Sequence, residues 1–161
     1  MKFLQKISVV LERISTYITC FAVLIMFISM LIQVFMRYVV NKPLFWSEEL
    51  ARFCMVLMTF SACFVAVKKG LMANIDLIVV KLNANVQKMV RTVVNLFGIV
   101  LLTFLSYLGI LLLFEFSVIN EIAVGTRIPM RIIYAIMPVG MMGMVFQLII
   151  NTLQEFIGKE A

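Results

Sequence analysis

Charged side chains interrupt an otherwise apolar chain between residues 37 and 52. The acids Glu48 and Glu49 and the base Arg52 fall within one short segment, Phe45-Trp46-Ser47-Glu48-Glu49-Leu50-Ala51-Arg52, and Arg37 and Lys42 precede it. On a helix, residues three and four apart are neighbours, so the Arg52 guanidinium is in reach of both carboxylates. Charges inside a membrane-crossing segment are costly, so they need partners or a place at the membrane surface.

Two interpretations of this cluster remain open. In the first, it is a helix end at headgroup level, with Ser47 as the N-cap, the acids in the first turn and Trp46 in the aromatic belt. In the second, its charges hold neighbouring helices or a partner subunit through hydrogen-bonded ion pairs. We favour the second because a helix end does not need so many charges. The predicted interface or packing residues are Arg37, Trp46, Glu48, Glu49 and Arg52.

The elements that must position these residues are membrane-spanning helices. The chain has 161 residues, of which 64% are hydrophobic, and a mean hydropathy of +1.12. The apolar residues gather in runs of about 20 or more, the length that crosses a bilayer as a helix. We predict an all-α integral membrane protein forming a single transmembrane domain over residues 1–161, with four spans at about 14–36, 44–67, 90–114 and 129–150.

Other segments refine this architecture. Apolar residues recur at close to helical spacing over Asn74–Arg91, which predicts an amphipathic helix lying in the membrane interface between spans two and three; the alternative is a buried loop. Ala62 and Ala66 lie one turn apart and predict a close helix–helix contact. Pro138 is interior to the fourth span and predicts a kink near Tyr134.

The distribution of basic residues predicts the orientation. With the N-terminus inside, nine lysines and arginines lie on the cytoplasmic side, against four or five outside. Both termini are therefore expected in the cytoplasm. The net charge of +6 then reflects topology and contact with anionic membrane lipid rather than nucleic acid.

Several classes of function are disfavoured. The chain has no histidine, which argues against a bis-imidazole haem and most zinc sites. Its cysteines, Cys20, Cys54 and Cys63, form no C-x-x-C pair and are typical of apolar packing residues. No nucleophile–base pair or metal-ligand set is visible. We expect no catalytic residue, metal or cofactor, and no enzyme activity.

The sequence resembles the small membrane subunit of the tripartite ATP-independent periplasmic (TRAP) transporter family. The resemblance covers the whole chain, and its most specific motif is Trp46-Ser47-Glu48-Glu49-Leu50-Ala51-Arg52. Supporting positions are Gln33, Arg37-Tyr38, Asn41, Pro43-Leu44, Phe60-Ser61-Ala62, Gly70, Asp76, Ile128-Pro129-Met130, Tyr134 and Pro138. The chain departs from the common pattern at Met72, Asn83 and Arg131, where many members have a histidine, a proline and an aromatic residue.

The resemblance implies partners and a process. Such a subunit works with a large membrane subunit that carries the transport path, and with a periplasmic substrate-binding protein, in the bacterial inner membrane. A sodium gradient drives uptake of organic acids, among them dicarboxylates, keto acids, sialic acid and other sugar acids. The small subunit is expected to brace the large one and help dock the binding protein. Charged residues of the outer loops are candidates for that docking: Lys42, Glu121, Arg127 and Arg131.

Two alternatives to this scaffold function stay open. A self-sufficient four-span transporter needs an acidic residue in a span, usually the first, and residues 14–36 contain none. A membrane-anchor subunit of another complex, such as a redox enzyme, would be expected to bring histidines or a cysteine cluster. A solvated loop also explains the outer charges nearly as well as docking does.

Overall fold

The computed structural model describes residues 2–42, 44–70 and 84–156. Four long helices make up most of this part of the chain: α1 (Lys2–Tyr38), α2 (Phe45–Lys68), α4 (Ala84–Leu113) and α6 (Met130–Phe156). A short helix, α5 (Phe116–Ile119), lies between α4 and α6. All four long helices contain a stretch long and apolar enough to cross a membrane. The predicted all-α fold with four spans is confirmed.

The helices are longer than the spans predicted from hydrophobicity. α1 begins near residue 2 rather than 14, α4 begins at Ala84 rather than 90, and α6 continues to Phe156 rather than 150. Hydropathy marks where a helix can lie in hydrocarbon, whereas backbone hydrogen bonding continues into the polar turns beyond it. α5 was not predicted, because a single turn leaves no periodic pattern.

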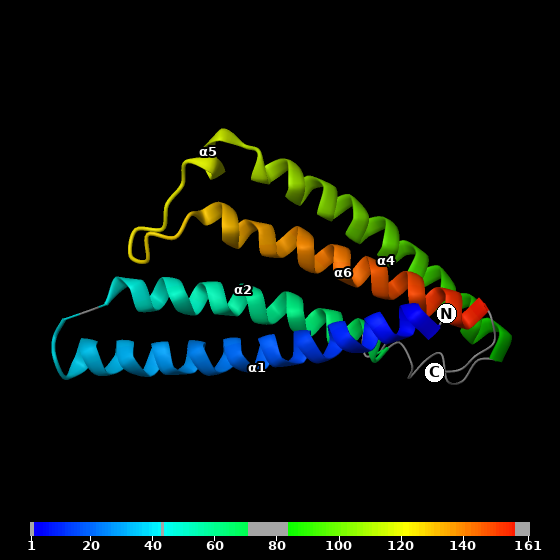
Figure 1. The fold of residues 1–161 in the computed structure, drawn as a ribbon, viewed down its shortest axis with the longest axis horizontal. Helices are drawn as coiled ribbons and strands as arrows, with labels where there is room; N and C mark the ends of the chain where they lie inside the picture. The colour runs from blue at the N-terminus through cyan, green and yellow to red at the C-terminus, as the bar shows by residue number, and fades with distance from the viewer. Residues whose placement is uncertain (1, 43, 71–83, 157–161) are drawn as a thin grey trace.

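The long helices form an open row rather than a closed bundle. Their main contacts run α1 to α2, α2 to α6 and α6 to α4, and Figure 1 shows them in this order from bottom to top. We call the end with Tyr38, Phe45 and Met130 the distal end, and the end with Lys2, Lys68 and Phe156 the terminal end. The α1–α2 pair and the α4–α6 pair lie closest at the terminal end and diverge toward the distal end (Figure 1).

α1 packs on α2 through small side chains repeated every seven residues. Ala22 and Ser29 are buried, and Ser15 in the same register is half-buried; Ser8, one step further toward the terminal end, is buried where α1 also meets α6. Ser47, Ala51 and Cys54 are buried on α2. Small residues allow two helix backbones to approach closely, which is the common way for helices to associate in lipid.

α6 is the inner helix of the second pair and contacts both neighbours. Toward α2, it contributes Met144 to an apolar cluster with Phe64 and Val67. Toward α4, Pro138 is buried and lies 3.3 Å from where a Cβ would stand at Gly109. Pro138 lies inside α6 without ending the helix, and its carbonyl accepts a hydrogen bond from the Ser106 hydroxyl at 3.3 Å. The kink near Tyr134 stays a prediction.

The predicted interfacial helix falls mostly outside the described residues. Residues 74–83 are not described, and residues 84–91 form the first turns of α4. Ala62 and Ala66 are half-buried on α2, and their packing role also stays a prediction.

Candidate functional site

The Glu49 carboxylate binds a loop that lies more than seventy residues away in the sequence. Its Oε1 and Oε2 accept hydrogen bonds from the Gly125 amide at 2.9 and 3.0 Å. Its Oε2 also accepts from the Thr126 amide at 2.9 Å and from the Thr126 hydroxyl at 3.1 Å. Hydrogen bonds to an ionised carboxylate are among the stronger ones in proteins. Glu49 therefore joins the beginning of α2 to the segment that leads into α6.

That segment is a compact hairpin, which we call the distal hairpin (residues 121–130). Ile122 and Pro129 form an antiparallel bridge, and the Met130 amide donates to the Glu121 carbonyl at 3.0 Å. Nearer the tip, the Ala123 amide donates to the Ile128 carbonyl at 3.0 Å. Arg127 reverses the chain with a φ of 55°, a left-handed conformation that is uncommon for residues other than glycine.

Only glycine fits where the tip of the distal hairpin meets α2. A Cβ at Gly125 would stand 2.8 Å from the Trp46 Cα and backbone nitrogen, and 3.1 Å from the Glu49 Oε2. Backbone atoms cannot move aside as the end of a side chain can. The sequence signal for this contact was a glycine in a polar loop, which alone does not identify its partner.

Glu48 and Arg52 form a separate pair. The Arg52 guanidinium donates to the Glu48 carboxylate, and these side chains are 71% and 50% exposed respectively. The acid-first spacing predicted this pair, but Arg52 does not bridge both acids, because the Glu49 carboxylate turns to the distal hairpin. The Glu48–Arg52 pair is left facing outward, where a solvated ion pair contributes roughly 0–1 kcal/mol.

The remaining predicted site residues lie at the same end without joining one network. The Arg37 guanidinium lies 5.8 Å from the centre of the Tyr38 ring, and the Arg131 guanidinium lies 5.5 Å from the centre of the Phe114 ring. Trp46 is exposed beside the hairpin tip. The charged docking candidates Lys42, Glu121, Arg127 and Arg131 are all exposed at the distal end.

Ser47 is not the N-cap of α2. The cap residue is Leu44, and the helix begins at Phe45, so Ser47 already lies in the first turn. Its hydroxyl donates back to the Leu44 carbonyl at 2.8 Å, and its side chain is fully buried. A small hydroxyl that bonds its own helix is compatible with the close contact between α1 and α2.

Sequence reasoning missed a polar network at the terminal end. The Ser8 hydroxyl donates to the Gln147 side chain at 2.6 Å, Gln147 donates to Asn151 at 2.8 Å, and Asn151 donates to the Val67 carbonyl at 3.0 Å. The Lys68 ammonium lies 2.8 Å from the Glu12 carboxylate. This network connects α1, α2 and α6. Glu12 was a visible signal, as an acid just before the first apolar run.

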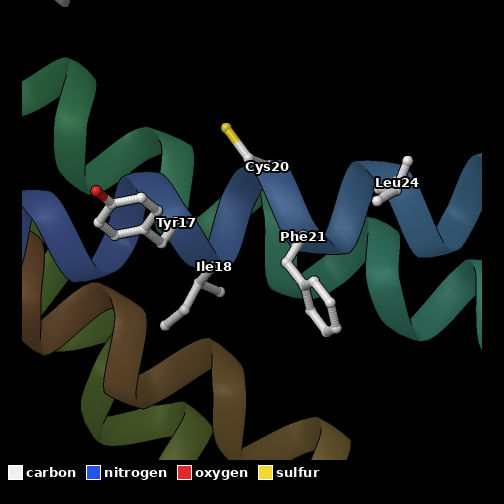
Figure 2. Close-up of a pocket in the computed structure, with 5 residues that line it drawn as sticks. All are labelled: Tyr17, Ile18, Cys20, Phe21 and Leu24. Carbon is white, nitrogen blue, oxygen red and sulfur yellow. The ribbon is translucent and has the colours of Figure 1, made fainter.

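An apolar groove lies on α1, lined by Tyr17, Ile18, Cys20, Phe21 and Leu24. In Figure 2, Ile18 and Phe21 point to the same side of α1, whereas Cys20 points to the opposite side. The groove lacks the converging polar groups that orient a polar substrate. It suits hydrocarbon, either a lipid chain or an apolar helix.

Comparison with known proteins assigns a family to most of the chain. The family model described as tripartite ATP-independent periplasmic transporters, DctQ component, matches residues 26–158. This range contains the Glu49 contact, the distal hairpin and all four long helices in whole or in part. A search of curated proteins gives no match.

Proposed function

Because the chain belongs to the DctQ family, the small membrane components of tripartite ATP-independent periplasmic transporters, we propose that it braces a large transport subunit and helps dock a periplasmic binding protein. The family match over residues 26–158 carries this proposal. The transporter takes up organic acids, such as dicarboxylates, keto acids or sugar acids including sialic acid, and a sodium gradient drives the uptake.

The open row of helices supports the scaffold function. α1 and α4 stand at the two edges of the row and expose aromatic rings, among them Tyr17, Phe21, Phe97 and Phe104. Such faces suit both lipid and the helices of a large membrane partner. Self-sufficient transport is less well supported, because Glu12, the acid of α1, is paired with Lys68.

The proposed orientation places the distal end in the periplasm of a bacterial inner membrane, with both termini in the cytoplasm. The excess of Lys and Arg on the terminal side supports it. In this orientation the exposed docking candidates and the distal hairpin face the compartment of the binding protein.

Reconstitution tests the proposed function. Proteoliposomes containing this chain, the large subunit and the binding protein are expected to accumulate the organic acid when an inward sodium gradient is applied. Liposomes lacking this chain are expected to lose uptake. Uptake by this chain alone, without the large subunit, would instead support a self-sufficient transporter.

Reversing the charge of Arg52 tests the predicted subunit interface. Arg52→Glu is expected to weaken the binding of the large subunit by about thirtyfold or more, and so to lower the amount that co-purifies with this chain, because a desolvated interface charge without its partner costs roughly 2–5 kcal/mol. The measurement is the ratio of the subunits after affinity purification from membranes.

The charge-swapped double variant Glu48→Arg, Arg52→Glu separates the interface from the internal pair. It restores an acid and a base four residues apart, although in the less favourable order. If the partner subunit needs the guanidinium where it stands, the swap does not restore co-purification. Full recovery, or full retention in Arg52→Glu, would show that the pair serves only its own helix.

A further inference from the structure

The distal hairpin is fixed at its base and at its tip. At the base, the Ile122–Pro129 bridge and the bond from the Met130 amide to the Glu121 carbonyl hold the two arms together. At the tip, the Gly125 amide and two groups of Thr126 bind the Glu49 carboxylate. A loop restrained in this way has lost most of its freedom before any partner arrives.

Glu49 binds the tip of the distal hairpin at the end where the two helix pairs diverge (Figure 1). The packing of α2 against α6 is centred on Phe60, Phe64 and Val67, toward the terminal end. At the distal end, the hydrogen bonds of Glu49 connect α2 to the segment entering α6. The conformation of the hairpin tip therefore depends on one carboxylate of another helix.

The hairpin presents apolar side chains outward. Val124 at the tip is 92% exposed, and Ile122 in the preceding arm is 60% exposed. Ala123 between them is buried, so the arm alternates outward and inward as an extended segment does. Phe45, next to the Trp46 backbone that the tip contacts, is 75% exposed. We call these three exposed apolar residues of the distal end, Phe45, Ile122 and Val124, the hairpin patch.

The distal hairpin also carries exposed charges of both signs. Glu121 and Arg127 flank its apolar residues along the chain, and both are exposed. A small apolar centre with a charged rim is the usual anatomy of a protein–protein interface, and small contact areas are typical of transient encounters. Flanking charges do not suit the hydrocarbon core. The patch therefore fits a soluble protein that binds and leaves better than a permanent membrane partner.

We propose that Glu49 is a positioning residue for docking: it holds the distal hairpin so that the hairpin patch, with Val124 at its tip, contacts the periplasmic binding protein. This inference rests on the proposed function, which supplies the binding protein as partner. A preformed loop lowers the conformational entropy lost on binding, so Glu49 strengthens docking without touching the partner.

Trypsin tests the positioning step without any partner. Arg127 is exposed in the hairpin, and cleavage after it requires local opening. Glu49→Gln replaces one of the two carboxylate oxygens by an amide NH₂ group. This NH₂ group is itself a donor, so it cannot accept the hydrogen bonds of Gly125 and Thr126. We expect cleavage after Arg127 to become about tenfold faster. The control Glu115→Gln removes an exposed acid from the same end and is expected to leave the rate unchanged.

Binding of the periplasmic protein tests the docking step. The complex of this chain and the large subunit is immobilised in lipid nanodiscs, and the binding protein is titrated over it. Glu49→Gln and Val124→Ser are each expected to raise Kd about tenfold, whereas Glu115→Gln leaves it unchanged. Val124→Ser keeps the Glu49 contacts, so its cleavage after Arg127 stays at the wild-type rate.

The outcomes separate this inference from the proposed function. Unchanged cleavage in Glu49→Gln would overturn the positioning role. Faster cleavage with wild-type Kd in Glu49→Gln, or wild-type Kd in Val124→Ser, would overturn the docking role of the hairpin alone. If the wild-type complex captures no binding protein at all, the proposed function itself fails.

Discussion

Replacing Gly140 with alanine is expected to destabilise the protein by about 1–3 kcal/mol, the usual range for overpacking a well-packed contact. A Cβ at Gly140 would stand 2.6 Å from the Phe60 Cβ and 3.1 Å from two atoms of its ring. The Phe60 Cβ is bonded directly to the backbone, so relief requires α2 and α6 to move apart. Because α2–α6 is the contact between the two helix pairs, the strain acts on the whole row.

Thiol labelling in detergent gives the measurement. Cys54 is buried on α2, so its reaction with a fluorescent maleimide reports unfolding as temperature rises. The exposed Cys20 and half-buried Cys63 are replaced by alanine in every variant. The Gly140→Ala protein is expected to unfold several degrees below the parent.

Gly98→Ala is the matched control. Gly98 lies on α4 and contacts α6 at Leu148. Its Cβ would meet only the Leu148 Cδ1, at 3.2 Å, and a leucine end can rotate away. Alanine also favours a helix over glycine by up to about 1 kcal/mol. Gly98→Ala is therefore expected to be neutral or stabilising. Equal midpoints for Gly140→Ala and Gly98→Ala would show that the α2–α6 contact is not tight at Phe60.

The four spans could be predicted because each is a continuous run of apolar residues. An apolar run long enough to cross a bilayer has few alternatives to a helix, since backbone groups in lipid must bond within the segment. The ends were less well predicted, as α1 shows: its first turns precede the apolar run, and there Ser8 and Glu12 contact Gln147 on α6 and Lys68 on α2. Those contacts depend on tertiary structure.

The charged residues at the distal end were predicted from the sequence, but the hydrogen bonds of Glu49 were not. Glu48, Glu49 and Arg52 were singled out for their charge, and the spacing of Glu48 and Arg52 identified their pair. The partner of Glu49 was not predictable, because Gly125 and Thr126 lie 76 and 77 residues further on and are uncharged. A carboxylate in a membrane protein was expected to find a base or a second chain, whereas here backbone amides of the same chain bind it.

This difference changes how the charged cluster supports a scaffold. Glu49 is satisfied within the chain, so its need for a partner no longer argues for a companion subunit. The exposed Glu48–Arg52 pair still supports a companion subunit. The two neighbouring acids, Glu48 and Glu49, are therefore expected to have different roles. Glu49 bonds the tip of the distal hairpin, and we expect the exposed pair to contact a lateral partner. Variants at the two positions are accordingly expected to affect different partners.

Removing Glu12 is expected to destabilise the protein more than removing Glu12 and Lys68 together. The side chains of Lys68 and Glu12 are 17% and 26% exposed, and the Lys68 nitrogen itself is buried from solvent. Glu12→Gln leaves this ammonium without its counter-charge, and an uncompensated buried charge is costly. We expect a loss of about 1–3 kcal/mol, below the full cost of a deep pair because the site is partly exposed.

The double variant Glu12→Gln, Lys68→Met removes the unpaired ammonium group and replaces it with an apolar side chain of similar length. It is expected to recover most of the lost stability, as replacements of buried ion pairs by hydrophobic groups often do. Lys68→Met alone leaves a more exposed carboxylate that can turn to water, so its effect should lie between the two. The Cys54 labelling midpoints of the four proteins complete a double-mutant cycle. Additive effects would show that Glu12 and Lys68 do not interact.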